Sequence, residues 1–230
     1  MRRILLIISL VSAFVVGANA QARNVRLGIK LGPTIDWASS GSTAATNDGI
    51  RLGGNLGLVY DHYFTDNIAI SSGVNFNFLR LKYTFSDCRR VEDFLEETDV
   101  TVARKLNATN IEIPLKVKFG YDVVDSFRAY AEVGAGLSIN CKDYGKDSYS
   151  FYWVSSEGTD YIDCTNQYRL LQLSMVFGLG TEYEINRNLS AFAQLTFDHA
   201  FSNAFVNSLE KQTGTLLRNN YVGIEVGILY

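Results

Sequence analysis

The sequence has few of the residues that mark a metal protein or a helical membrane protein. It contains two histidines and three cysteines, with no Cys-x-x-Cys pair, and this scarcity argues against a metal site. Proline occurs only at Pro33 and Pro114, a composition that suits long uninterrupted strands. No stretch after residue 20 approaches the roughly 20 apolar residues that a transmembrane helix needs. Helical periodicity is also nearly absent, so we expect an all-β protein.

The first twenty residues have the pattern of a secretory signal. Two arginines, at positions 2 and 3, precede an apolar run at 4–16, and the small-residue site Ala-Asn-Ala occupies 18–20. We therefore expect a signal peptide over residues 1–20 and one barrel domain over residues 21–230. Removing the two arginines takes the formal net charge from −3 to −5, which gives no reason to expect nucleic acid as a partner.

Eight segments of the remaining chain alternate apolar with small or polar side chains, as an amphipathic strand does. In the last of them, NNYVGIEVGILY, aliphatic residues fall on one face of the strand, and glycine and glutamate fall on the other. The predicted strands are 25–35, 50–60, 67–84, 109–121, 127–140, 168–184, 188–201 and 219–230.

The connections between these strands alternate in length along the chain. Short turns are predicted at 61–66, 122–126 and 185–187, and long connections at 36–49, 85–108, 141–167 and 202–218. Bacterial outer-membrane barrels have an even number of strands, short periplasmic turns and long extracellular loops. We therefore predict an eight-stranded antiparallel up-and-down transmembrane β-barrel in the outer membrane, with four extracellular loops and both mature termini in the periplasm.

A soluble lipocalin-like barrel is the competing interpretation, because it also alternates but keeps its apolar face inside. Glycines dominate the polar face here, and small residues suit the narrow interior of an eight-stranded membrane barrel. Four tyrosines stand where strands meet the short turns, as an interfacial girdle requires: Tyr60, Tyr121, Tyr183 and Tyr230. The membrane interpretation predicts that branched aliphatic side chains face outward and that glycines and charges face the lumen.

Three segments carry a resemblance to a known family: RLGIKLG at 26–32, IEIPLKVKFG at 111–120 and the closing strand. Together they resemble the PorT-like outer-membrane β-barrel proteins, over nearly the whole mature chain. The resemblance implies an outer-membrane barrel of Gram-negative bacteria. It implies little about activity, since PorT itself is linked to a protein secretion system while many relatives have no assigned role. The aromatic terminus, Tyr230, implies recognition of the C-terminal strand by the barrel-insertion machinery.

The predicted lumen face carries charged residues of both signs. An unpaired charge in a dry interior costs roughly several kcal/mol, so we expect these residues to pair. The predicted network comprises Lys30, Arg51, Glu112, Lys116, Glu132, Glu182 and Glu225. We interpret it as a salt-bridged plug that closes the barrel, and a narrow polar pore or ligand cleft is the alternative.

One group of residues has the types of a hydrolytic triad, Asp198, His199 and Ser202. Because Asp198 and His199 are adjacent in a strand, their side chains point to opposite faces, which argues against a hydrogen-bonded relay. We therefore expect no enzymatic activity, and a lipid-modifying enzyme stays a minor alternative. The sequence indicates no cofactor.

The cysteines all fall in predicted long loops. Cys141 and Cys164 bracket the third loop at the ends of neighbouring strands, so they form the favoured disulfide in an oxidising compartment. Cys88 is then unpaired, and the alternative is a bond from Cys88 to either of the others.

The long loops are the expected functional surface, because loops on a rigid scaffold often carry binding. Tyr149, Tyr152 and Trp153 in the third loop form the candidate binding surface, although such aromatic residues also pack loops down or rest at lipid headgroups. We therefore expect a structural or surface-binding barrel, with a narrow channel or a secretion-associated barrel as the alternative. The expected partners are outer-membrane lipid and lipopolysaccharide, the insertion machinery, and an extracellular or secretion-system protein.

Overall fold

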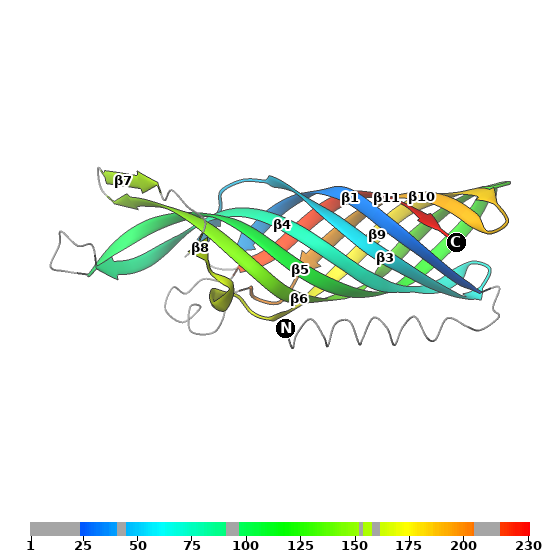
Figure 1. The fold of residues 1–230 in the computed structure, drawn as a ribbon, viewed down its shortest axis with the longest axis horizontal. Helices are drawn as coiled ribbons and strands as arrows, with labels where there is room; N and C mark the ends of the chain where they lie inside the picture. Colours follow the sequence, from blue (N-terminus) through cyan, green and yellow to red (C-terminus); the bar gives the residue numbers. More distant parts are fainter. Residues whose placement is uncertain (1–23, 41–44, 91–96, 152–153, 158–161, 205–216) are drawn as a thin grey trace.

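The structure is a computed structural model that describes residues 24–40, 45–90, 97–151, 154–157, 162–204 and 217–230. Eight long antiparallel strands close into a barrel, which confirms the predicted architecture (Figure 1). The predicted signal peptide at residues 1–20 lies outside the described residues. Within the described part of the chain, no helix is long and apolar enough to span a bilayer.

Each barrel strand pairs with the strands before and after it, and the first pairs with the last. Three short strands and one 3-10 helix add to the ends of the barrel strands: β2 pairs with β4, and β7 and β8 pair with β6. The barrel strands are β1 (Val25–Ser40), β3 (Arg51–Thr65), β4 (Ile68–Arg90), β5 (Glu97–Val124), β6 (Phe127–Phe151), β9 (Leu171–Asn186), β10 (Leu189–Ala200) and β11 (Leu217–Leu229). The additions are β2 (Ala45–Asn47), β7 (Val154–Glu157), β8 (Ile162–Asp163) and η1 (Thr165–Gln167).

The two ends of the barrel differ in their connections. At one end, residues 66–67, 125–126 and 187–188 make tight turns, shorter than predicted because the flanking strands continue further. Both β1 and β11 reach this end, where the backbones of Leu27 and Tyr230 exchange hydrogen bonds of 2.7 and 2.8 Å. We call it the short-turn end, and the opposite end the long-loop end.

The predicted long loops at 85–108 and 141–167 are in large part strand, which corrects the sequence-based assignment. β4 and β5 stay paired as far as Arg90 opposite Glu97, and β5 and β6 stay paired as far as Thr101 opposite Ser150. Figure 1 shows β4, β5 and β6 extending well past the other strands at the long-loop end. The barrel therefore carries a three-stranded extension where two long loops were predicted.

The reason for this error is an inversion of polarity along the extended strands. On β4, Phe76 and Phe78 face outward while Asn77 faces the lumen. Further along the same strand, Leu81 faces inward and is fully buried, whereas Lys82 faces outward. The strand thus leaves a hydrocarbon surrounding and enters water, where an apolar core must lie inside. Past Phe78, the extension has the pattern of a soluble protein.

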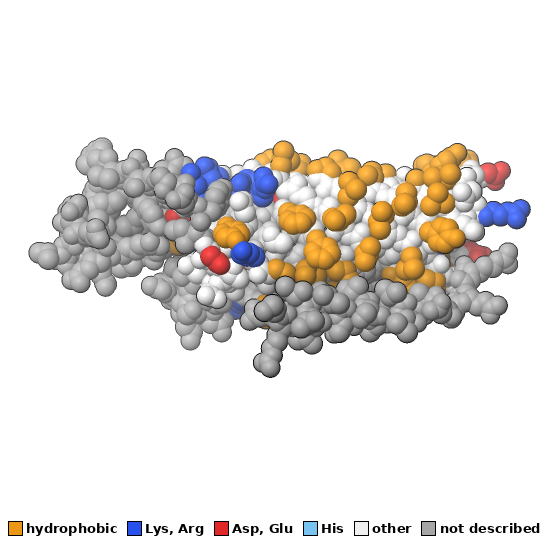
Figure 2. Space-filling view, viewed as in Figure 1, with side chains coloured by type: hydrophobic (Ala, Val, Ile, Leu, Met, Phe, Trp, Pro, Cys, Tyr) orange, Lys and Arg blue, Asp and Glu red, His pale blue; other side chains and the backbone are white. Residues whose placement is uncertain are grey.

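The outer wall of the barrel is apolar over a continuous belt, which confirms the predicted orientation of the strands. Figure 2 shows hydrophobic side chains over the barrel wall between its two ends. Leu179 is 64% exposed and Ile224 is 61% exposed, while Gly223 and Glu225, on either side of Ile224, face inward. The belt also includes Leu27, Ile29, Leu31, Leu56, Leu58, Leu115, Phe119, Leu173, Phe177, Leu195, Val226 and Ile228. A soluble lipocalin would show the reverse arrangement.

An apolar cluster fills the barrel interior at the long-loop end. Leu81, Tyr83, Val102, Leu106 and Leu217 are each at most 1% exposed. The cluster also contains Ala38, Ala45, Leu79, Phe85, Ala108, Cys164, Tyr168, Ala204 and Tyr221. It connects the extension to the barrel.

Candidate functional site: the barrel lumen

The lumen nearest the short-turn end holds a chain of ion pairs. Lys118 Nζ lies 2.7 Å from an oxygen of Asp61 and also contacts the carboxylate of Glu182. Arg26 reaches the same Glu182 at 3.0 Å. The ammonium of Lys118 also lies 4.2 Å from the centre of the Tyr130 ring, within the range of a cation–π contact. One buried acid is thus shared by cations from two strands, β1 and β5.

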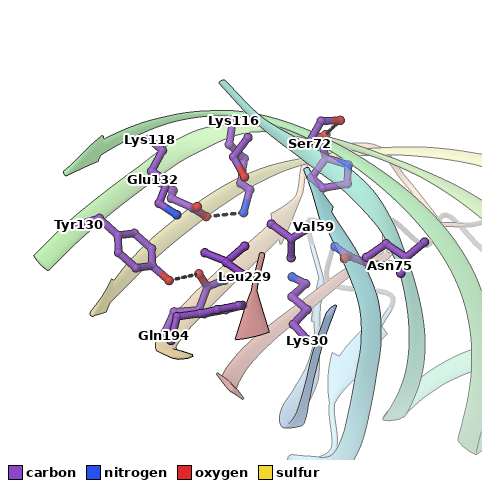
Figure 3. A pocket seen from close by; sticks show the side chains of 14 residues that line it. Lys30, Val59, Ser72, Asn75, Lys116, Lys118, Tyr130, Glu132, Gln194 and Leu229 are labelled. Atoms are coloured by element: carbon purple, nitrogen blue, oxygen red, sulfur yellow. Dashed lines mark hydrogen bonds and ion pairs between the residues drawn. The ribbon is translucent and has the colours of Figure 1, made fainter. Parts of the chain in front are cut away.

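The middle of the lumen contains two further buried pairs, and Figure 3 shows the one between Lys116 and Glu132. Lys30 Nζ donates to both oxygens of Glu225, at 3.1 and 2.9 Å, and the ammonium of Lys116 contacts Glu132. Glu225 also accepts hydrogen bonds from Gln194 at 2.5 Å, from Thr196 at 3.1 Å and from Asn55. A charge this completely bonded is stable inside a barrel from which water is excluded.

Two lumen acids are held by neutral donors instead of cations. Glu112 accepts from Asn77 Nδ2 at 2.5 Å, from Asn75 Nδ2 at 3.3 Å and from the Tyr221 hydroxyl at 3.3 Å. Asp198 accepts from the Ser174 hydroxyl at 2.7 Å. Among the described residues, neither acid forms an ion pair. The predicted salt-bridged plug therefore occupies only part of the lumen. Toward the long-loop end, Glu112 and Asp198 are held by hydrogen bonds from neutral side chains.

A small gap lies among the ion pairs. It has a volume of about 10 Å³ and is lined by Lys30, Lys116, Glu132 and Tyr130 among others. Such a gap holds about one water molecule. In Figure 3 the Tyr130 hydroxyl points toward Gln194, to which it donates at 2.8 Å. The described lumen is therefore packed by side chains.

A larger polar cavity of about 690 Å³ opens at the short-turn end. Two guanidinium groups lie near the Tyr63 ring, with Arg26 at 5.4 Å and Arg128 at 5.3 Å from its centre. Glu184 and Ser190 are also part of the lining. The cavity has the size of a small-ligand site, roughly 300–1,000 Å³. It shares no lining residue with the small gap among the ion pairs.

At the long-loop end, Arg104 anchors the extension from inside. Its guanidinium makes a bidentate pair with Asp147 at 2.6 and 2.7 Å and donates to Gln167 at 2.5 Å. Its Cζ lies 5.3 Å from the centre of the Phe85 ring. These contacts join β4, β5, β6 and η1 above the apolar belt. They make the extension a packed unit.

The predicted lumen residues are brought together except for Arg51. Lys30, Glu112, Lys116, Glu132, Glu182 and Glu225 are all buried within the barrel. Arg51 lies closer to the long-loop end, where it donates to the backbone oxygens of Leu81 and Leu106 at 3.2 and 3.1 Å and to Asn107. Arg51 therefore bonds to the backbones of β4 and β5 beyond the last paired residues of β3 and β4. It is not part of the central network.

The charges predicted from the sequence to face the lumen leave out Asp61, the partner of Lys118. Asp61 falls in a predicted short turn, because the alternation pattern predicts that strand β3 ends at residue 60. In the structure β3 continues to Thr65. The odd-numbered residues of this strand face the lumen, and these include Asn55, Gly57 and Asp61. If the same alternation is continued past residue 60, Asp61 is predicted to face the lumen, where it meets Lys118 of β5.

The predicted Cys141–Cys164 disulfide is absent, and both cysteines are free thiols. Cys141 is exposed on the outer wall, whereas Cys164 is buried in the apolar cluster, so the two side chains lie on opposite sides of the sheet. Burial raises the pKa of the Cys164 thiol to about 11, which keeps it protonated at neutral pH. The side chain of Cys88 lies outside the described residues.

The remaining predicted residues are separate from this site. Asp198 is buried in the lumen, while the His199 ring stacks on Phe197 at 6.3 Å on the outer wall. Ser202 bonds to the backbone of Leu173, so the three triad residue types do not meet. The side chains of the predicted binding surface, Tyr149, Tyr152 and Trp153, lie outside the described part of the chain.

Comparison with known proteins gives the family. Residues 18–209 match the family described as outer membrane protein beta-barrel domain. The chain belongs to this outer-membrane barrel family. Its members are proteins of the bacterial outer membrane, and the apolar belt and closed barrel described above agree with that location. No curated protein matches the chain.

The chain is similar to several solved outer-membrane barrels at low sequence identity. OprG from Pseudomonas aeruginosa is 12% identical, with a TM-score of 0.44, and the match covers 90% of this chain and 96% of OprG. A major outer membrane protein from Thermus thermophilus is 13% identical, with a TM-score of 0.44 and coverage of 90% and 98%. The outer membrane protease OmpT from Escherichia coli is 10% identical, with a TM-score of 0.40 and coverage of 92% and 99%.

Proposed function

We propose that this barrel is a closed, non-enzymatic outer-membrane protein that acts as a structural or surface-binding element through its long-loop end. The observation that carries the proposal is the packing of the lumen. The gap of about 10 Å³ among the ion pairs has room for about one water molecule, and an apolar cluster follows toward the long-loop end. A barrel closed in two ways is poorly suited to conduct solutes, whereas its extension offers a rigid surface outside the apolar belt.

The purified protein is expected to show no steady ion conductance in a planar lipid bilayer. Conductance requires a continuous water path, and buried ion pairs followed by an apolar cluster oppose one. A large porin inserted into the same bilayer is the positive control for the recording. Reproducible single-channel steps from the wild-type protein would contradict the closed lumen and favour the alternative of a narrow channel.

In the proposed orientation, the long-loop end faces the outside of the cell and the short-turn end faces the periplasm. Single cysteines introduced by Lys146→Cys and Arg187→Cys, in a chain whose native cysteines are replaced by serine, place one thiol at each end. Both positions are accessible on the described surface. A membrane-impermeant maleimide is expected to label the first variant in intact cells and the second only after permeabilisation. The reverse labelling would overturn the orientation.

A secretion-associated role, as in the PorT-like proteins, is the second candidate. The polar cavity of about 690 Å³ at the short-turn end favours it, because in the proposed orientation this cavity faces the periplasm. Chemical crosslinking in cells through an Asp125→Cys variant on its rim, followed by mass spectrometry, would test it. Recovery of secretion-system proteins at Asp125→Cys but not at the opposite end would favour this role. The insertion machinery is a further proposed partner, through the C-terminal strand.

A further inference from the structure

Three asparagines form a row on the inner face of the neighbouring strands β4, β5 and β6 (Figure 1). Asn110 on β5 lies directly opposite Asn77 on β4 and, on its other side, directly opposite Asn140 on β6. Each of the three is at most 5% exposed. Residues directly opposite each other in an antiparallel pair have Cα atoms about 4.5–5.5 Å apart, so the three amide groups are neighbours. We call Asn77, Asn110 and Asn140 the asparagine row.

A β-bulge on β6 brings an acid to the end of this row. The pairing between β5 and β6 shifts between Thr109 and Asn110, which leaves Cys141 as an extra residue on β6. Without that residue, strict alternation from Asn140 would turn position 143 outward. In the structure Asn140 and Asp143 are both buried while Cys141 is exposed. The bulge thus directs Asp143 inward, where its Oδ2 oxygen accepts a hydrogen bond from Asn140 Nδ2.

The row and Asp143 present four buried oxygens that have no hydrogen-bond partner, namely Oδ1 of each asparagine and Oδ1 of Asp143. Chemistry fixes the amide orientation at both ends of the row, because an ionised carboxylate only accepts hydrogen bonds. Nδ2 of Asn77 must therefore face Glu112, and Nδ2 of Asn140 must face Asp143, so the two carbonyl oxygens point elsewhere. Buried acceptors without a partner are costly, and native proteins leave few of them.

The charge of Asp143 is not balanced by a side chain. Asp143 is 1% exposed and forms no ion pair with any residue that the structure describes. Arg104, a buried cation of the extension, is held by Asp147 at 2.6 Å, and Lys142 lies on the outer face. The exposed Asp163 of β8 adds a second negative charge to the surroundings of Asp143. The end of the asparagine row is therefore suited to a cation.

Two other buried acids with an unpartnered oxygen have a basic residue beside them. Asp61 pairs with Lys118 at 2.7 Å, and Asp36 is the register partner of Arg51 on β3. Asp143 differs from both, because its neighbours are the carbonyl oxygens of the asparagine row.

We propose that Asp143 and the asparagine row bind a calcium ion. Ca²⁺ takes about 6–8 oxygen ligands from carboxylates, Asn carbonyls, backbone carbonyls and water, in flexible geometry. Mg²⁺ requires near-ideal octahedral geometry and keeps several of its waters, which suits a packed interior less well. In the described part of the chain, no three residues of the types His, Cys, Asp and Glu gather as metal ligands, so amide oxygens supply much of this site. The scarcity of histidine and cysteine argues against zinc-type sites, and calcium needs neither residue.

The position of the site gives the ion a structural role. The backbone N–H of Asp143 donates to Thr165 Oγ1 at 2.9 Å, and the N–H of Cys164 donates to the Asp143 carbonyl at 3.0 Å. These bonds attach β8 and η1 to the inner edge of β6. An ion held between Asp143 and the asparagine row would therefore join β4 and β5 to the same unit and stabilise the base of the extension.

Refolding in the presence of calcium tests this inference. Because the site is enclosed, the ion must enter as the barrel folds. The detergent-solubilised protein is refolded in millimolar Ca²⁺, in millimolar Mg²⁺ or in a chelator, and the denaturant midpoint of unfolding is compared among the three. The wild type is expected to have its highest midpoint in Ca²⁺. Asp143→Asn removes the carboxylate of the site and is expected to lose more than about tenfold in Ca²⁺ affinity, which abolishes the shift.

Asn110→Asp is a second variant that gains an acid at the centre of the row. In a chelator its two buried acids repel each other, so the folded fraction on heat-modifiability gels is expected to fall. Ca²⁺ is expected to restore folding, because affinity for this ion rises with the number of charged ligands. A folded fraction of Asn110→Asp that does not respond to Ca²⁺ would contradict the site even if Asp143→Asn failed to fold.

Asp198→Asn is the matched control, because it removes another buried lumen acid, one that is held by Ser174. It is expected to keep the Ca²⁺ shift of the wild type. Loss of the shift in Asp198→Asn but not in Asp143→Asn would overturn the placement of the ion. Equal wild-type midpoints in Ca²⁺ and in chelator would show that water satisfies these oxygens, and equal midpoints in Ca²⁺ and Mg²⁺ would overturn the assignment to calcium. These measurements do not depend on the direction of insertion or on whether the lumen conducts.

Discussion

Replacing Glu225 with alanine is expected to destabilise the barrel by about 3–5 kcal/mol, the range for removing one partner of a buried ion pair. The Glu225 side chain is fully buried, and its loss would leave the ammonium of Lys30 unpaired at 5% exposure. The donors on Gln194, Thr196 and Asn55 would lose their acceptor in the same change. Reversible unfolding in denaturant, in a lipid or detergent system that supports refolding, measures the difference.

Two further variants test whether the loss of stability in Glu225→Ala comes from leaving a buried charge unpaired. The double variant Lys30→Met, Glu225→Leu removes both charges and is expected to recover most of the stability, because no uncompensated charge remains. Asp48→Asn breaks the exposed pair with Lys82, whose side chains are 40% and 34% exposed, and is expected to cost less than about 1 kcal/mol. A cost for Asp48→Asn similar to that for Glu225→Ala would show that burial does not control the energetics of these pairs.

Replacing Gly32 with alanine is expected to disrupt the seam between the first and last strands. A Cβ at this position would lie 2.0 Å from the backbone oxygen of Ile224 and 2.9 Å from the Cα of Glu225. Because both atoms belong to the main chain of β11, they can move only if β1 and β11 separate locally. Overpacking typically costs about 1–3 kcal/mol, and a clash with backbone places this variant at or above the upper limit. The folded fraction, read from heat-modifiability on gels after refolding, is expected to fall sharply.

Gly54 provides a matched control for this substitution. It lies on the neighbouring strand β3, and an added Cβ would meet only the Gly32 backbone oxygen, at an ordinary 3.5 Å. Gly54→Ala is therefore expected to refold as the wild type does, because both variants gain the same methyl group but only one of them clashes. Equal folding yields for the two variants would show that the β1–β11 seam tolerates a side chain at residue 32.

The lumen network was only partly predictable from the sequence. The inward parity of Lys30, Glu112 and Glu225 follows from strict alternation within each strand, which needs no knowledge of neighbouring strands. The pairing partners depend on the register between strands that are far apart in the chain, such as β1 and β11. Sequence reasoning therefore identifies most members of the network but includes Arg51 and leaves out Asp61.

The amino-acid sequence by itself determined the strand number, the direction of each face and the alternation of short and long connections. These properties are local, because period-2 patterning and turn residues act within a few positions. The tertiary structure alone decided that β4, β5 and β6 continue past the belt as a packed extension, with Leu81 inside and Lys82 outside. A segment with apolar residues on its inward face forms a strand here only because neighbouring strands supply backbone hydrogen bonds and apolar side chains to pack against. Both depend on contacts between residues distant in sequence. The separation of Cys141 from Cys164 has the same origin, since closure of the sheet places one thiol outside and the other inside.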